Sequence, residues 1–325
     1  MTANRVVDRP ALRVYTKLVA VCTFLLLLAG GMVTSTGSGL AVPDWPLSFG
    51  RVMPAMEGGV LYEHGHRMIA TFVGALIVLE ALWLWRTEPR RWVRTLGWLA
   101  LGGVVVQGLL GGLTVLLRLP DPVSISHAGL AQLVFGVTVA IALARSRDWT
   151  RSGPAAALDS GVPSLFSLGV VAAVLIWLQI LVGAIVRHSG AGLAIPTFPL
   201  AYGRLVPPLE SFPVVIHFAH RAGAVVVTLA VAWVVARVLR RHREDARLVR
   251  PAALLALLVA LQIGLGGWVI LSYKAAWVTT AHLGTGALLF AVSLVLALRA
   301  RRHLSLAPAP AHPPIQPHLD VAGIR

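Results

Sequence analysis

The chain has 325 residues, of which 57% are hydrophobic and only 13% are charged, and its formal net charge is +15. A soluble domain carries about 25% charged residues, so this composition excludes a soluble globular protein and predicts an integral membrane protein. The basic residues lie in short links between apolar segments, as in membrane loops, so we expect no nucleic-acid partner.

Eight apolar segments are each long enough to cross about 30 Å of hydrocarbon as a helix. The first follows a basic N-terminal stretch, as in a signal peptide, but its pattern recurs inside the chain, so we expect it to be retained. The sequence therefore predicts an all-α polytopic membrane protein. The predicted spans are 15–36, 62–85, 93–116, 124–145, 165–187, 213–239, 251–272 and 276–298.

The distribution of basic residues predicts the orientation. The N-terminus, the C-terminus and the links on their side of the membrane hold 21 Lys and Arg residues, whereas the links on the other side hold five. Basic residues concentrate on the cytoplasmic side of a membrane. We therefore expect a multi-pass protein of the cell (inner) membrane with both termini in the cytoplasm.

The second half of the chain repeats the first. Residues 107–113 match 262–268, and the loop 39–51 matches 192–204. Four spans are thus duplicated, and because four is an even number both copies insert the same way up, related by an axis near the membrane normal. We predict two four-helix bundles. The predicted units are 1–150, 151–302 and a disordered cytoplasmic tail at 303–325, rich in Pro and Ala, whose His303, His312 and His318 face solvent.

Four histidines form two matched pairs, one in each half. His220 follows His66 by 220 − 66 = 154 residues, and His282 follows His127 by 282 − 127 = 155. Each lies near the outer start of an even-numbered span, so all four are expected at similar depth near the outer leaflet. Glycines around them allow close approach of helices or of a flat ligand. These are Gly74, Gly108, Gly111, Gly112, Gly129, Gly223, Gly264, Gly266, Gly267, Gly284 and Gly286.

A single histidine in a membrane helix often only forms a hydrogen bond to a neighbouring helix. Four at matched depth instead favour two sites for six-coordinate haem iron, each with one axial imidazole per face. A zinc site is less favoured because it requires three or four converging ligands.

A carboxylate accompanies only the first pair. Glu63 lies three residues before His66 and shares its helix face, whereas the equivalent position in the second half holds His217. A buried carboxylate near iron can transfer protons or stabilise positive charge on a substrate. The alternative is that Glu63 only forms an ion pair with Arg67.

The neighbouring polar residues have plainer interpretations. For His217 an ordinary interhelical hydrogen bond is favoured, and His64 is expected at the membrane interface. Arg67 and Arg221 each follow a histidine of a pair, and they are candidates either for binding haem propionates by charge-assisted bonds or for anchoring at the interface.

With these motifs, the sequence resembles the haem A synthase family over about residues 15–300. The resemblance implies an eight-helix oxidoreductase that converts haem O to haem A by oxidising one ring methyl group to a formyl group through successive hydroxylations. The matching motifs are Glu63-x-x-His66-Arg67, His127-Ala128-Gly129, His217-x-x-His220-Arg221, Ala281-His282-Leu283-Gly284, and the loop 39–46 with its copy.

The resemblance also implies roles for the site residues. His220 and His282 would hold a resident haem b, His66 and His127 would bracket the substrate haem O, and Glu63 would be the catalytic carboxylate. In one respect the chain departs from the family. Many members carry a cysteine pair in the first outer loop, whereas the single cysteine here, Cys22, lies in the first span, which leaves the electron route open.

Two other functions fit the duplicated pattern. One is a non-catalytic dihaem cytochrome b that carries electrons from quinol. The other is a transporter or haem permease, ranked last because no run of polar residues along one helix would line a path. For the favoured enzyme we expect haem O as substrate, a haem O synthase as its candidate source, the lipid bilayer, and an electron donor that the sequence does not identify.

Overall fold

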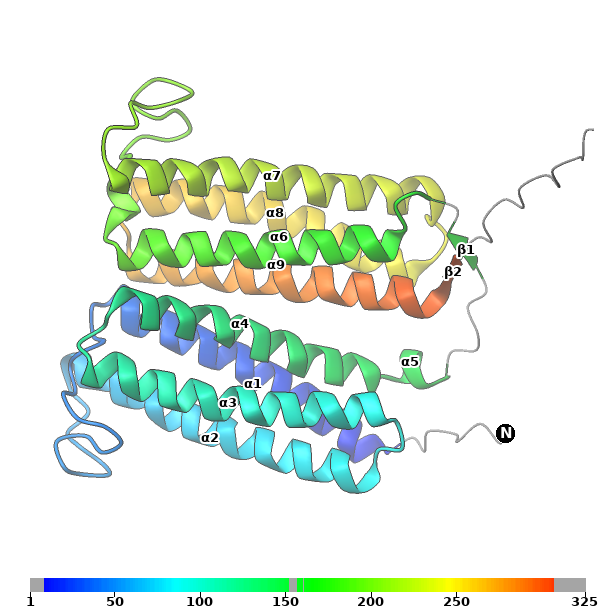
Figure 1. Cartoon of the computed structure of the whole chain (residues 1–325), viewed down its shortest axis with the longest axis horizontal. Helices are drawn as coiled ribbons and strands as arrows, with labels where there is room; N and C mark the ends of the chain where they lie inside the picture. Colours follow the sequence, from blue (N-terminus) through cyan, green and yellow to red (C-terminus); the bar gives the residue numbers. More distant parts are fainter. Residues whose placement is uncertain (1–8, 152–156, 160, 307–325) are drawn as a thin grey trace, which may run out of the picture.

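The computed structural model describes residues 9–151, 157–159 and 161–306. Within these residues, eight helices are long and apolar enough to cross a membrane, which confirms the eight predicted spans and the all-α class (Figure 1). The shortest has 24 residues, or about 36 Å at 1.5 Å per residue. The eight helices are α1 (Pro10–Ser35), α2 (Gly58–Thr87), α3 (Arg91–Leu116), α4 (Asp121–Ala144), α6 (Leu165–His188), α7 (Phe212–Arg241), α8 (Ala246–Leu271) and α9 (Ala276–His303).

The link between the halves contacts the end of the last helix. In parallel register, β1 (Ala157–Asp159) pairs with β2 (Leu304–Leu306). His303, which we expected in a solvated tail, is instead the last residue of α9 and is only 4% exposed, and its ring contacts Asp148 of the link and Arg247. The remaining short elements are α5 (Arg147–Arg151) and η1 (Ala191–Leu193). Residues 307–325, with His312 and His318, lie outside the described residues.

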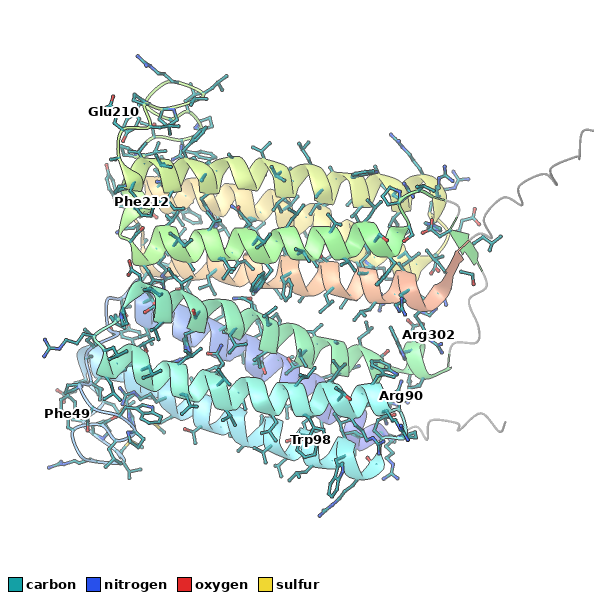
Figure 2. The ribbon with its side chains drawn as sticks, in the orientation of Figure 1. Phe49, Arg90, Trp98, Glu210, Phe212 and Arg302 are labelled. Carbon is teal, nitrogen blue, oxygen red and sulfur yellow. The ribbon has the colours of Figure 1, made fainter. Side chains whose placement is uncertain are left out.

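The two halves lie side by side with their helices running in similar directions (Figure 1). Helices α1 to α4 form one bundle and α6 to α9 form the other, and the loops 36–57 and 189–211 project from the same end, which we call the loop end. The opposite end carries Arg90 and Arg302 (Figure 2), and we call it the arginine end. The duplicated bundles are therefore present, with both copies the same way up.

Contacts between the halves are reciprocal. A Cβ added at Gly129 of α4 would lie 2.5 Å from Leu181 of α6. At the equivalent Gly284 of α9, an added Cβ would lie 2.6 Å from Leu28 of α1, and Leu28 is the equivalent of Leu181 at the offset of 153 residues. This exchange of partners is what a two-fold axis produces, and the common loop end in Figure 1 places that axis along the helices.

The two long loops are folded back onto their own bundles in the same way. Trp45 lies against Gly112 of α3, where an added Cβ would be 2.8 Å from the indole ring. Phe198 lies against the equivalent Gly267 of α8, at 2.7 Å from its added Cβ. A larger residue at either glycine would push the loop away from the bundle. Each loop also contains one short antiparallel bridge. The bridges are Ser48↔Arg51 and Ala201↔Arg204.

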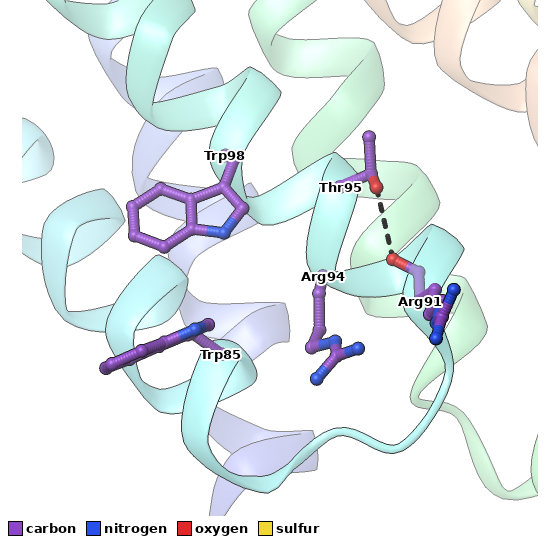
Figure 3. Close-up of a pocket in the computed structure, with 5 residues that line it drawn as sticks. All are labelled: Trp85, Arg91, Arg94, Thr95 and Trp98. Carbon is purple, nitrogen blue, oxygen red and sulfur yellow. Dashed lines mark hydrogen bonds between the residues drawn. The ribbon is translucent and has the colours of Figure 1, made fainter.

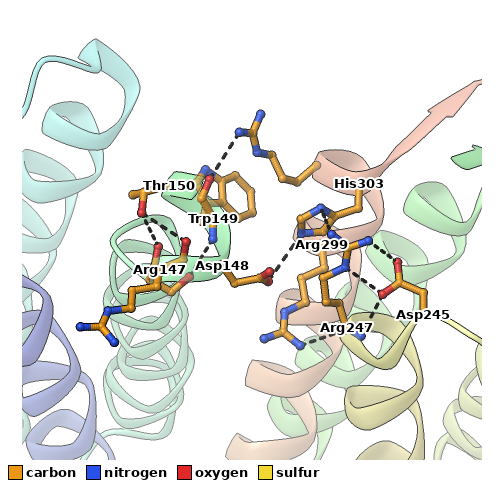
Figure 4. A network of polar contacts seen from close by, with 10 residues as sticks. Arg147, Asp148, Trp149, Thr150, Asp245, Arg247, Arg299 and His303 are labelled. Atoms are coloured by element: carbon orange, nitrogen blue, oxygen red, sulfur yellow. Dashed lines mark hydrogen bonds and ion pairs between the residues drawn. The ribbon is translucent and has the colours of Figure 1, made fainter. Parts of the chain in front are cut away.

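Ionic contacts join the halves at the arginine end (Figure 4). Asp148 of α5 lies 3.6 Å from Nε2 of His303. Nδ1 of the same histidine lies 3.2 Å from the Arg247 guanidinium, which donates to Asp245 at 2.8 Å. The short helix after α4 is therefore connected to the ends of α8 and α9.

One buried acid lies away from all of these contacts. Glu80 of α2 is 0% exposed, and neither of its carboxyl oxygens has a hydrogen-bond partner. The equivalent residue in the second half is Val234, which is 1% exposed. The first half also contains the buried Thr16 and Thr23 of α1. The interior of the first half is therefore more polar than the sequence suggested.

We expect Glu80→Val, which introduces the residue of the second half, to raise the free energy of unfolding by about 1–3 kcal/mol, because a buried polar group without a partner carries a cost of that size. Denaturation of the purified protein in detergent measures the change. The reciprocal Val234→Glu should lower stability. Unchanged or reduced stability in Glu80→Val would show that the carboxyl has a stabilising partner.

Candidate functional site

The four paired histidines lie at similar depth below the loop end. His66 and His220 are each eight residues from the first residue of α2 and α7, and His127 and His282 are each six residues from the first residue of α4 and α9. At 1.5 Å per residue these positions are about 12 Å and 9 Å along their helices. The structure thus places all four histidines at similar depth relative to one another, as the sequence predicted.

The second pair is close enough to share one metal ion. The ring centroids of His220 and His282 are 6.3 Å apart, and the ring planes are inclined by 68°. Two metal–nitrogen bonds take up about 4 Å of such a separation, and the remainder corresponds to the distances from each ring centre to its nitrogen. This spacing fits an iron ion between the two rings.

The first pair is built in the same way. His66 and His127 come from α2 and α4, and they lie within electrostatic reach of each other. Their Nδ1 atoms are buried and have no hydrogen-bond partner, and the same is true of the Nδ1 of His282. An unpartnered buried nitrogen destabilises the protein, and binding of the ring to a metal ion would offset that cost. The shared iron between His66 and His127 stays a prediction.

Each imidazole ring packs against a glycine of the neighbouring helix. A Cβ added at Gly30 or Gly183 would lie 3.0 Å from Cε1 of His66 or His220. The corresponding distances are 3.4 Å from Gly111 to His127 and 3.2 Å from Gly266 to His282. The sequence predicted Gly111 and Gly266 but missed Gly30 and Gly183, although the offset of 153 residues relates these two. An added Cβ would meet nothing within 4 Å at three other predicted glycines, so no protein group lies against them, and their contact with a flat ligand stays a prediction. They are Gly74, Gly108 and Gly264.

The ligand set argues against the zinc alternative. Among the described residues, no group of three or more His, Cys, Asp or Glu side chains converges on a common point. A structural or catalytic zinc ion requires at least three protein ligands. Two imidazoles close to each other, as His220 and His282 are, are instead what an iron porphyrin needs, since the porphyrin supplies the other four nitrogens.

Glu63 is buried and holds the first loop. Its carboxylate accepts two hydrogen bonds, from the backbone N–H of Val42 at 2.8 Å and from Nη2 of Arg67 at 2.6 Å. Arg67 also donates to the carbonyl oxygens of Asp44 and Leu47, at 2.8 Å and 3.0 Å. The predicted ion pair between Glu63 and Arg67 is therefore present, and it fixes the loop over the start of α2.

His217 takes the structural place of Glu63 in the second half. Its Nδ1 accepts from the backbone N–H of Ile195 at 3.3 Å, and Ile195 is the equivalent of Val42. Arg221 donates to the carbonyl oxygens of Ile195 and Thr197, at 2.9 Å and 2.8 Å. The carboxylate therefore occurs only in the first half, and the neutral histidine keeps only its hydrogen bond to the loop, not to another helix as we had favoured.

Two further predictions bear on these side chains. Both arginines bind loop carbonyl oxygens, so their proposed contact with haem propionates stays a prediction, although Nη1 of Arg221 is buried without a partner.

His64 was expected at the interface, but it is only 7% exposed, with Nδ1 2.7 Å from the Ser48 hydroxyl. The first loop covers it, which the sequence pattern of α2 alone does not reveal.

Two surface hollows are lined by residues other than the paired histidines. One, of about 360 Å³, is lined by Trp85, Arg94, Trp98 and their neighbours at the arginine end (Figure 3). Trp85 is 19 residues beyond His66 on α2, or about 28 Å along the helix. This hollow is therefore separate from both histidine pairs.

Comparison with known proteins gives a consistent result. Residues 57–294 match the family COX15-CtaA, described as cytochrome oxidase assembly protein. The chain is 35% identical to the haem A synthase of Symbiobacterium thermophilum over 269 residues, which cover 80% of this chain and 86% of the relative. It is 31% identical to the haem A synthases of Shouchella clausii (77% and 84% covered) and of a Chelativorans species (85% and 87% covered).

Proposed function

The chain belongs to the COX15-CtaA family of cytochrome oxidase assembly proteins, and we propose that it is a haem A synthase, a membrane oxidoreductase that oxidises one ring methyl group of haem O to the formyl group of haem A. The observation that carries this function is the asymmetry between two otherwise matched sites. Each half has a histidine pair packed on glycines, but only the first has a buried carboxylate three residues from a histidine.

The second half is suited to a resident haem b. With ring centroids 6.3 Å apart, His220 and His282 would hold one haem iron between them, and no carboxylate of α7 takes the place of Glu63. A bound haem b supplies one-electron transfer. The protein's contribution here is to hold both imidazoles at fixed depth and spacing.

The first half is suited to the substrate haem. His66 and His127 would bracket the iron of haem O and hold its porphyrin next to the first loop. Oxidation of the methyl group to a formyl group removes four electrons, which must pass to an external oxidant, and adds one oxygen atom from water or dioxygen. It also breaks two C–H bonds, so the site needs a group that accepts protons. Glu63 is the carboxylate on the same helix face as His66, and its hydrogen bonds to Val42 and Arg67 keep it in place.

The surroundings follow from the same assignment. The excess of basic residues at the arginine end supports a cytoplasmic location for that end and for both termini, so both haem sites would lie near the outer face of the cell membrane. Haem O would arrive through the bilayer or from a haem O synthase. Cys22 lies on α1, so electron transfer would not use a cysteine pair in the first loop.

Pigment analysis tests the proposal. The protein is expressed in cells that make haem O but lack their own haem A synthase, and the haems are extracted and separated. We expect haem A, or its hydroxylated precursor, only when the protein is present. Two tightly bound haem b per chain and no modified haem would overturn the proposal in favour of the dihaem electron carrier.

A further inference from the structure

Besides the glycine that each ring packs against, the histidines of the two halves have different hydrogen-bond partners. In the second half, Nε2 of Gln179 on α6 donates to the carbonyl oxygen of His220 at 2.6 Å and lies 3.0 Å from its Nδ1. The equivalent residue on α1, 153 positions earlier, is Leu26. A leucine side chain has no polar group, so His66 lacks this partner, and its Nδ1 is buried without a hydrogen bond.

The space for this glutamine is also specific to the second half. Gln179 reaches His220 across Gly223 of α7, where an added Cβ would collide with the amide oxygen of Gln179. The equivalent of Gly223 in the first half is Ile69. The second half therefore combines a glutamine with a glycine, whereas the first half combines a leucine with an isoleucine. Only the glutamine and glycine of the second half let an amide contact the histidine ring.

The other ring of each pair shows the same difference. The amide nitrogen of Gln262 lies 3.3 Å from Nε2 of His282. Its equivalent, Gln107, donates to the backbone carbonyl of His127 at 2.8 Å and leaves the Nδ1 of that ring without a partner. Both rings of the second half thus have an amide contact, whereas neither ring of the first half has one. The Nδ1 atoms of His66, His127 and His282 are all without a partner, so His220 is the paired histidine whose Nδ1 an amide contacts.

From this difference we propose that Gln179 is a positioning residue that keeps the haem of the second half permanently bound, and that Leu26 leaves His66 free to release the modified haem. The proposal rests on the assignment of a resident haem to the second half and of an exchanging haem to the first. A histidine that binds iron through Nε2 carries a proton on Nδ1, so in the haem-bound protein the Gln179 amide would turn to accept that proton through its oxygen. Partners that fix the ring of a metal-bound histidine in this way typically change metal affinity 10–100-fold. A difference in haem affinity of that size would let the second half retain its haem while the first half releases its product.

The test measures haem retention in a His66→Ala background, in which only the second pair can hold a haem on both faces. Purified protein is mixed with excess apomyoglobin, and transfer of haem b is followed by absorbance. We expect Gln179→Leu to lose haem b about 10–100-fold faster than the parent. Gln179→Glu should retain it, with a lower midpoint potential, because a carboxylate makes the bound imidazole more basic.

The reciprocal change uses the first half as a matched control. Leu26→Gln combined with Ile69→Gly, in a His220→Ala background, should slow transfer of haem from the first pair. Equal retention in the parent and in Gln179→Leu, with an unchanged spectrum and midpoint potential, would overturn the proposal. Because haem b retention is measured without haem O, failure here is distinguishable from failure of the enzyme to make haem A.

Discussion

Glu63→Gln is expected to retain bound haem and to lose conversion of haem O, with the rate falling about 10²–10⁴-fold, the usual contribution of a positioned acid or base. Glutamine preserves the size of the side chain and an oxygen that can accept from the Val42 N–H, but it cannot take up a proton from the methyl carbon. The measurement is the ratio of haem A to haem O in extracted pigment, together with total haem per protein.

His217→Gln is the matched control, because His217 makes the equivalent contact to Ile195 in the second half. It keeps an acceptor for that N–H and should leave conversion unchanged. Glu63 also anchors the first loop through Arg67, so protease sensitivity of residues 36–57 is compared in both variants. If Glu63→Gln still converts haem O at the parental rate, the carboxylate has only the structural role of holding the loop.

Much of the fold could be predicted because its determinants are local. The length of each helix follows from the length of its apolar segment. The duplicated motifs show that His66 is equivalent to His220 and that His127 is equivalent to His282. Spacing along one helix was also sufficient to place Glu63 within reach of Arg67, as the 2.6 Å contact confirms.

The remainder depends on contacts between distant segments. Gly30 lies against His66 because α1 packs on α2, and a hydrophobic pattern does not show which residue of one helix faces which residue of another. His64 and His303 looked exposed for the same reason, since a loop covers the first and a strand pairing follows the second. For Arg67 and Arg221 the sequence left propionate binding and interfacial anchoring open, because it does not show that the loops fold back over them.

The second large effect concerns a buried ion cluster at the arginine end. Glu88, directly after α2, accepts from the Arg90 guanidinium at 2.7 Å and 3.0 Å and from Arg145 at the end of α4 at 2.7 Å. Glu88 and Arg145 are each 2% exposed. Burial by itself would raise the pKa of Glu88, but the hydrogen bonds and charges of Arg90 and Arg145 outweigh burial and lower it.

We expect Glu88→Gln to lower the free energy of unfolding by about 3–5 kcal/mol at neutral pH, because it leaves the Arg145 charge buried without its partner. Since the pKa of Glu88 is lower in the folded protein than in the unfolded chain, its contribution is complete above the unfolded value of about 4.3 and is lost as the pH falls through the folded value. Unfolding in detergent at several pH values should show the parent and the variant converging in acid.

Glu244→Gln is the control for a loss of charge alone. Glu244 lies 4.0 Å from Arg243, and their side chains are 91% and 78% exposed, so this pair is solvated and contributes little. Its removal should leave the unfolding curve unchanged at every pH. If Glu88→Gln behaves like Glu244→Gln, then Arg145 has another counterion, and the junction of α2, α3 and α4 does not depend on this carboxylate.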